Sequence, residues 1–301
     1  MKPLFGKKPG IKHEKGRRTG MIKLACMTLP YIREPFERAL AGIAKAGYTY
    51  VAFGYPHAGV EVPNEEAEPE REAERLRSLL KTYGLEAVML FGNIQLAPGQ
   101  PFERSRNRLL MAKALGISEV LSVGISNYRK FPDDKASDGE MKPKYEAFVA
   151  SWKRIAAEAE ALGVTLTLKP HGGNTATAME LTETLRQIGS PSVRACYDPG
   201  NVAYYEGVSP EQDFPRILDQ LHSLIAKDHR GAMAVADFPV PGTGDVDFGA
   251  MFAAMKRADL QGSVLVERVD GSPEPEAIDR RIAEARQRLG DLLSAAGLDW
   301  R

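Results

Sequence analysis

The chain alternates short apolar runs with longer segments in which apolar residues recur every three or four positions. The clearest helical pattern covers residues 145–162, and Gly163 follows it, as glycine often follows a helix end. The next residues, 164–169, alternate apolar and polar side chains, which predicts a strand that stops at Pro170. Gly172 and Gly173 then allow a tight loop, and Thr177 can cap another helix.

This strand–helix unit repeats along the chain. The pattern predicts strands over residues 22–28, 48–53, 85–91, 117–123, 164–169, 193–198, 224–228 and 263–267. A helical segment follows each strand, and the sixth is predicted from Ser209–Pro210 through Leu221. Residues 129–144 form a long loop, either a lid or a flexible excursion.

Eight such units predict a (β/α)8 barrel, a fold that typically needs about 250 residues. We therefore expect one domain over residues 21–301. A doubly wound parallel sheet is the alternative, but no glycine-rich phosphate loop of the form G-x-G-x-x-G follows the first strand.

Composition limits the classes of partner. Lys plus Arg equals Asp plus Glu, 40 against 40, so we expect neither nucleic acid nor a membrane as a partner. No apolar run approaches the length of a membrane span. Cys26 and Cys196 are too few for a disulfide framework, which favours a cytoplasmic location and suggests core residues rather than nucleophiles.

Residues 1–20 differ from the rest of the chain. They hold seven Lys and Arg residues and one acid, Glu14, and no apolar segment follows as it would in a secretory signal. We interpret them as a flexible basic extension, a tail exposed to solvent.

Polar residues gather where the predicted strands end. In a (β/α)8 barrel the carboxyl ends of the strands build the active site. Several ends offer groups that could contact a substrate, and we select His57, Asn174, Asn201, Lys227 and Asp228. Simpler interpretations exist: His57 could be an ordinary loop residue, and Lys227 and Asp228 could form a salt bridge.

Five motifs in register, KPHGGNTAT, CYDPGN, AKDHRG, GTGDVDF and VLVE, resemble those of the xylose-isomerase-like sugar phosphate isomerase/epimerase superfamily, over residues 21–293. The resemblance implies a (β/α)8 barrel acting on sugars or keto-sugars, often as a homo-oligomer. It also implies a divalent metal held by Glu on strand five, Asp on strand six, His on strand seven and Glu on strand eight.

This chain keeps half of that implied ligand set. Asp198 matches the strand-six Asp and Glu267 the strand-eight Glu, but Lys169 stands at the Glu position and Ile225 at the His position. His222 has the opposite strand parity to Ile225 and should point away from the barrel interior.

We expect the Lys169 ammonium to replace the cation and to pair with Asp198 and Glu267, so that no cofactor is needed. A Schiff-base role is less favoured, because two adjacent carboxylates stabilise the protonated lysine. Two alternatives stay open: Lys169 is only a structural ion pair, or Asp198, Glu267 and His171 hold Mn²⁺ or Mg²⁺.

The resemblance implies proton transfer next to a sugar carbonyl, as in isomerisation or epimerisation, with elimination or hydration of a keto-sugar close behind. Glu267 would be the acid or base, Lys169 the electrophile and Asp198 its orienter, and His171 would contact substrate or orient its loop. A sugar-binding pseudoenzyme is another alternative. The DNA-repair branch of the superfamily needs a His-rich metal cluster, which five His residues in all do not form here.

Overall fold

The computed structural model describes residues 21–301, so the predicted basic extension lies outside the described residues. Eight parallel strands close into a barrel in the order β1-β10-β9-β8-β7-β4-β3-β2. These strands are β1 (Lys23–Met27), β2 (Tyr50–Phe53), β3 (Glu86–Phe91), β4 (Glu119–Val123), β7 (Thr165–Lys169), β8 (Val193–Tyr197), β9 (Leu221–Ala226) and β10 (Ser263–Val266).

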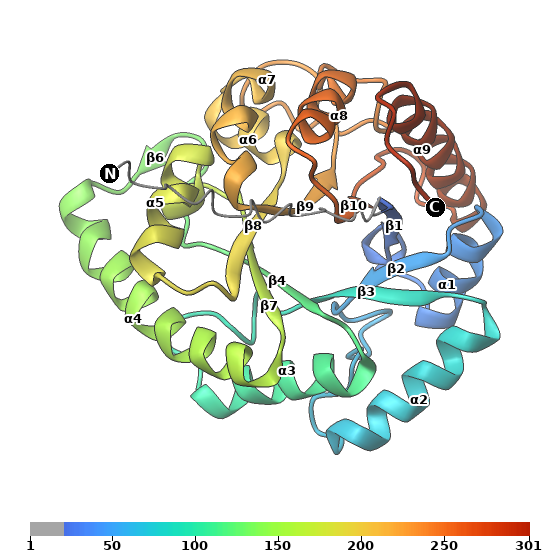
Figure 1. Ribbon diagram of the computed structural model, residues 1–301, viewed down its shortest axis with the longest axis horizontal. Coiled ribbons are helices and arrows are strands. Elements are labelled where there is room, and N and C mark those ends of the chain that lie inside the picture. The colour runs from blue at the N-terminus through green and yellow to red at the C-terminus, as the bar shows by residue number, and fades with distance from the viewer. Residues whose placement is uncertain (1–20) are drawn as a thin grey trace, which may run out of the picture.

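Helices surround this barrel (Figure 1). They are α1 (Phe36–Lys45), α2 (Pro69–Thr82), α3 (Phe102–Leu115), α4 (Asp138–Leu162), α5 (Ala178–Ile188), α6 (Pro199–Glu206), α7 (Pro210–Asp213), α8 (Phe248–Arg257) and α9 (Pro275–Ala295). None of the helices in residues 21–301 combines the length and the apolar character needed to cross a bilayer.

Closure of the sheet confirms the predicted (β/α)8 barrel and excludes the doubly wound alternative. The first strand pairs with the last as well as with the second: Ala25 lies opposite Leu265 on one side and opposite Tyr50 on the other. A doubly wound sheet would leave two open edges instead.

Local sequence explains where the elements around the central strand begin and end. Gly163 ends α4 with a left-handed φ of 71°, a conformation that costs other residues energy. Thr177 caps α5 as predicted: its hydroxyl accepts from the amide of Met179, and Glu180 reaches back to the amide of Thr177. The end of α4 at Gly163 and the start of α5 at Thr177 therefore place β7 and the loop after it at the rim of the barrel.

The core has two parts. Between strands and helices, α4 contributes Phe148 and Trp152, whose rings stack with centroids 5.3 Å apart. Inside the barrel, a smaller apolar group includes Met89, Cys196 and Ile225. Both cysteines are fully buried, as expected of core residues, and burial raises the pKa of each thiol.

Two predicted segments were wrong. The helix expected through Leu221 is a single turn, α7, followed by short 3-10 turns, because Pro215 interrupts it; Leu221 already begins β9. The loop expected over 129–144 is instead a hairpin, β5 (Tyr128–Lys130) with β6 (Asp134–Lys135), followed by the first turns of α4. A further difference is that Ser209 precedes α7 without capping it, and its hydroxyl donates to Glu211.

Candidate active site

Charged residues stand at the ends of four consecutive barrel strands. Lys169 ends β7, Asp198 follows β8, Lys227 comes directly after β9, and Glu267 comes directly after β10. These strands are neighbours in the closed sheet (Figure 1). Each residue lies two positions beyond one that faces the barrel interior, such as Cys196 before Asp198, so the four side chains converge above the apolar interior.

The four side chains form a buried ring of alternating charge. The Nζ atom of Lys169 donates to Oδ2 of Asp198 at 3.0 Å and to a carboxylate oxygen of Glu267. The Nζ atom of Lys227 donates to the other oxygen of Glu267 at 3.3 Å and lies 3.9 Å from Asp198. No side chain of the ring exceeds 7% exposure. We call these four residues the charged ring.

The ring holds Lys169 and Glu267 in their charged forms. Burial opposes the charged ammonium of Lys169, but the carboxylates of Glu267 and Asp198 outweigh burial and raise its pKa above the ordinary range. Burial also opposes the charged form of Glu267, yet Lys169 and Lys227 lower its pKa to about 2. A protonated Lys169 is a hydrogen-bond donor rather than a nucleophile, which favours the electrostatic role over the Schiff base.

His171 lies beside the ring. Its Nε2 atom is 3.2 Å from the hydroxyl of Tyr205, and the two ring centroids are 4.8 Å apart. Burial, together with the charges of Lys169 and Lys227, lowers the pKa of His171 to about 4. The imidazole is therefore neutral near pH 7.

Two predicted substrate-binding asparagines position the loops of the site. Asn201 accepts from Lys227 Nζ at 2.6 Å and donates to the carbonyl of Pro170 at 2.7 Å. The Oδ1 atom of Asn174 accepts from the amide of Ile125 at 2.7 Å, while its buried Nδ2 has no hydrogen-bond partner. Contact of either residue with a substrate stays a prediction.

His57 and Asp228 lie in internal hydrogen-bond networks. Asp228 is fully buried and accepts from five backbone amides, those of His229, Gly242, Thr243, Gly244 and Val246. His57 is 1% exposed, with Nε2 2.9 Å from the hydroxyl of Thr28 and Nδ1 3.2 Å from a backbone oxygen. These contacts favour a structural role for both, because no nitrogen of His57 and no oxygen of Asp228 is left unpaired; no observation tests their contact with substrate.

An aromatic group closes one side of the site, and none of the residues selected from the sequence belongs to it. Tyr204 and Tyr205 come from α6, Phe238 from the loop after β9, and Phe131 from the tip of the β5–β6 hairpin. The Phe131 ring lies 5.0 Å from each of the two tyrosine rings. The signal that could have identified the hairpin is the pair Tyr128 and Phe131 within an otherwise polar segment.

A cavity of about 580 Å³ reaches the ring from the loops after β1 and β10. Lys227 and Glu267 line its inner end, and Arg33, Arg268 and Ser272 line other parts of it. A small polar molecule that enters this cavity meets an ammonium and a carboxylate side by side.

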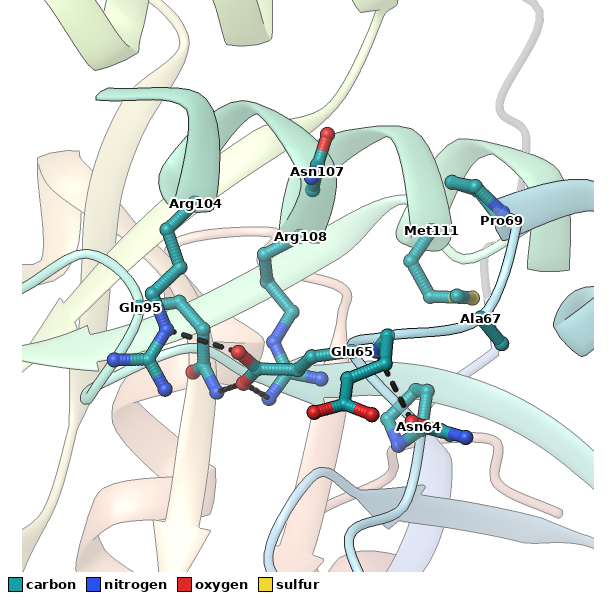
Figure 2. Close-up of a pocket in the computed structure, with 11 residues that line it drawn as sticks. Asn64, Glu65, Ala67, Pro69, Gln95, Arg104, Asn107, Arg108 and Met111 are labelled. Atoms are coloured by element: carbon teal, nitrogen blue, oxygen red, sulfur yellow. Dashed lines mark hydrogen bonds and ion pairs between the residues drawn. The ribbon is translucent and has the colours of Figure 1, made fainter. Parts of the chain in front are cut away.

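A second cavity, of about 320 Å³, lies away from the ring between α3 and residues 63–69 (Figure 2). Arg104 and Arg108 extend from α3 toward Glu65. The carboxylate of Glu65 accepts a hydrogen bond from Arg104 at 2.9 Å and another from the side-chain amide of Gln95. These bonds attach the segment that precedes α2 to helix α3. The residues around this cavity therefore hold that loop in place.

The fold and the ring together define a (β/α)8 barrel with a charged site at the carboxyl ends of its strands. Residues 40–289 match the family model described as xylose isomerase-like TIM barrel, and the chain belongs to that family. This finding confirms the resemblance seen in the motifs.

Individual proteins show the same likeness. The chain is 26% identical over 217 residues to an inosose dehydratase of Geobacillus kaustophilus, with 64% of this chain and 70% of that protein covered. A xylose isomerase domain protein from Alicyclobacillus acidocaldarius superposes with a TM-score of 0.71 at 20% identity, over 92% of this chain and 99% of that one. The D-psicose 3-epimerase of Clostridium cellulolyticum H10 gives a TM-score of 0.71 at 16% identity, over 90% and 99%.

The residues present do not fit the divalent metal that the resemblance implies. Ile225, at the expected His position, is fully buried among apolar side chains. Asp198 and Glu267 already pair with ammonium groups, which would repel a cation. Within residues 21–301, no three His, Cys, Asp or Glu side chains are grouped so that they could hold a metal ion.

Proposed function

We propose that this protein is an enzyme that acts on a sugar or keto-sugar by moving a proton next to a carbonyl group, as an isomerase or epimerase. The observation that carries the proposal is the charged ring, which places Lys169 and Glu267 in contact at the carboxyl ends of the strands. Membership of the xylose isomerase-like family supports a sugar as the substrate class. The buried free thiols also favour a reducing, cytoplasmic setting.

Three members of the ring have a role in this proposal. Lys169 donates a hydrogen bond to the substrate carbonyl oxygen and stabilises the negative charge that develops there. Glu267 removes the proton from the adjacent carbon and returns it to the neighbouring carbon or to the other face of the same carbon. Asp198 holds the ammonium of Lys169 in place.

The low pKa of Glu267 needs a change before this carboxylate can act as a base. In the free protein both ammonium groups stabilise its charge. A substrate carbonyl oxygen that accepts a hydrogen bond from Lys169 competes with Glu267 for that ammonium and weakens the bond between Lys169 and Glu267. The basicity of Glu267 therefore rises when substrate binds. The ring would thus keep its base inactive until a carbonyl is present.

A keto-sugar dehydratase is the second candidate function, favoured by the identity to an inosose dehydratase. The first step is the same: Glu267 removes the proton next to the carbonyl. The electron pair then expels the hydroxyl group on the next carbon, which leaves as water after taking a proton from the nearby ammonium group of Lys227, and Glu267 can return its proton to that amine.

An activity screen tests both candidates. The purified protein is incubated with ketohexoses, ketopentoses and inososes in deuterated water, and exchange, isomer formation and loss of water are followed by NMR and mass spectrometry. We expect Lys169→Met and Glu267→Gln each to reduce turnover by about 100-fold or more. Retained activity in both variants would refute the assignment. A sugar that raises the melting temperature without any turnover would indicate a sugar-binding pseudoenzyme instead.

We also propose that the Lys169 ammonium occupies the place of the family's cation. Elemental analysis of protein purified without chelator tests this directly. We expect no stoichiometric metal in the wild type, and about one equivalent of Mn²⁺ in the double variant Lys169→Glu/Ile225→His, which offers three carboxylates and an imidazole. A full equivalent in the wild type would overturn the proposal, and the metal would then be assigned to Asp198, Glu267 and His171.

A further inference from the structure

The contact between Tyr205 and His171 joins two elements of the site. His171 lies in the loop after β7, and Tyr205 lies in the last turn of α6. Their polar atoms are 3.2 Å apart, and burial raises the pKa of Tyr205, which keeps its hydroxyl protonated. A neutral imidazole carries one N–H and one bare nitrogen, so this hydrogen bond decides which nitrogen holds the proton.

The strengths of donor and acceptor select one direction. A phenol hydroxyl is a stronger donor than a neutral imidazole N–H, and a bare imidazole nitrogen is a stronger acceptor than a phenol oxygen. Among residues 21–301, the hydrogen bond of the half-buried Tyr205 hydroxyl is the one to His171 Nε2. The hydroxyl therefore donates to Nε2, and the imidazole proton lies on Nδ1.

The β5–β6 hairpin holds Tyr205 from the opposite side. The hydroxyl of Tyr128 donates to the backbone oxygen of Tyr205 at 2.9 Å, and the ring of Phe131 packs against the Tyr205 ring. Lys135 forms an ion pair at 2.9 Å with Glu206, the residue that follows Tyr205. Three contacts from a short hairpin therefore fix the position of the phenol.

We propose that Tyr205 is a positioning residue that fixes neutral His171 in the tautomer with its proton on Nδ1. The imidazole then presents an N–H group, which can donate to a substrate oxygen without giving up a full charge. This use of His171 rests on the proposed function, whereas the tautomer itself does not.

Nitrogen-15 NMR of the imidazole groups in the full chain measures the tautomer without any substrate. The chain has five histidines, and a His171→Asn variant assigns the signal. In the wild type near pH 7 we expect Nδ1 protonated and Nε2 bare. In Tyr205→Phe we expect a shift toward the Nε2–H form, which an unconstrained histidine side chain prefers. A wild-type signal with Nε2 protonated, or the same signal in Tyr205→Phe, would overturn the proposal.

Tyr83→Phe is the control, because it removes the same hydroxyl group from a tyrosine at the end of α2, outside the site. With an active substrate, we expect Tyr205→Phe to lower kcat about tenfold with little change in KM, and Tyr83→Phe to stay near the wild type. Equal kinetic effects of the two changes would contradict positioning through His171. If no sugar is turned over, the NMR result still decides the tautomer, so the two proposals fail separately.

Discussion

Lys169→Met is the most direct perturbation of the charged ring. The substitution keeps an unbranched side chain of similar length and removes the ammonium that contacts both carboxylates. Asp198 and Glu267 would then share one remaining ammonium, that of Lys227, at 3.9 and 3.3 Å. Two buried carboxylates with one partner leave part of a charge uncompensated.

The structure sets the size of the effect. Removing one partner of a buried ion pair costs about 3–5 kcal/mol, and the lower end applies because Lys227 still contacts Glu267. Unfolding entropy of about 2.1 cal/mol/K per residue gives roughly 0.6 kcal/mol/K for 301 residues. A loss of about 3 kcal/mol therefore lowers Tm by about 5 °C.

The effect should depend on pH with a defined sign. Because the pKa of Glu267 in the folded protein, about 2, lies below its unfolded value of about 4.3, the ring stabilises the wild type fully above about pH 5. This contribution is lost as pH falls through the window between those two values. In Lys169→Met the carboxyl binds a proton more readily, so the stability gap between the two proteins narrows as pH falls.

Thermal unfolding followed by circular dichroism at pH 8, 6 and 4 measures this gap. Lys23→Met is the control, because Lys23 forms an exposed pair with Glu86 at 2.9 Å and should contribute less than about 1 kcal/mol. If Lys169→Met melts within about 1 °C of Lys23→Met at pH 8, or if the gap widens toward pH 4, the reasoning on the ring is wrong.

Three further outcomes are expected. The profile of kcat/KM against pH should stay flat from about pH 5.5 to 9, because the pKa values of Glu267 and His171 lie well below that range, and a steady-state profile with an acid limb near pH 7 would contradict this. Asp228→Asn should cost about 3 kcal/mol or more, because an amide nitrogen cannot accept backbone N–H groups, with faster proteolysis of residues 229–247 as the measurement. Arg104→Gln should loosen residues 63–69 without changing turnover, and unchanged amide exchange there would show that the bond to Glu65 is not an anchor.

The architecture could be predicted from sequence because apolar residues follow one spacing in the strands and another in the helices, and this change repeats in each strand–helix unit. Strand β7 is framed by Gly163 and Thr177, and both act as the local rules require. The helix predicted to reach Leu221 failed for two reasons. Pro215 interrupts it locally, and β9 begins at Leu221, where strand pairing outweighs the weak helical spacing.

The candidate site was predictable only in part. The family resemblance grouped Lys169, Asp198 and Glu267, and their contacts agree with that expectation. Their position at a strand end grouped Asp228 with Lys227, but the carboxylate of Asp228 binds loop amides while the ammonium of Lys227 joins the ring. Neighbouring strand residues point to opposite faces, so spacing does separate Lys227 from Asp228. Spacing does not reveal the partners of Asp228, because the loop that surrounds it folds back from 14 to 18 residues later.

The alternating charges of the ring affect how strongly the barrel mouth attracts a charged solute from a distance. Two positive and two negative groups in sequence around a rim make an electric quadrupole with no net charge, and its potential falls with distance far faster than that of an ion. Beyond a few ångströms the barrel mouth attracts neither anions nor cations through this ring. Capture of a solute would then depend on diffusion and close contact, and the association rate should hardly respond to ionic strength.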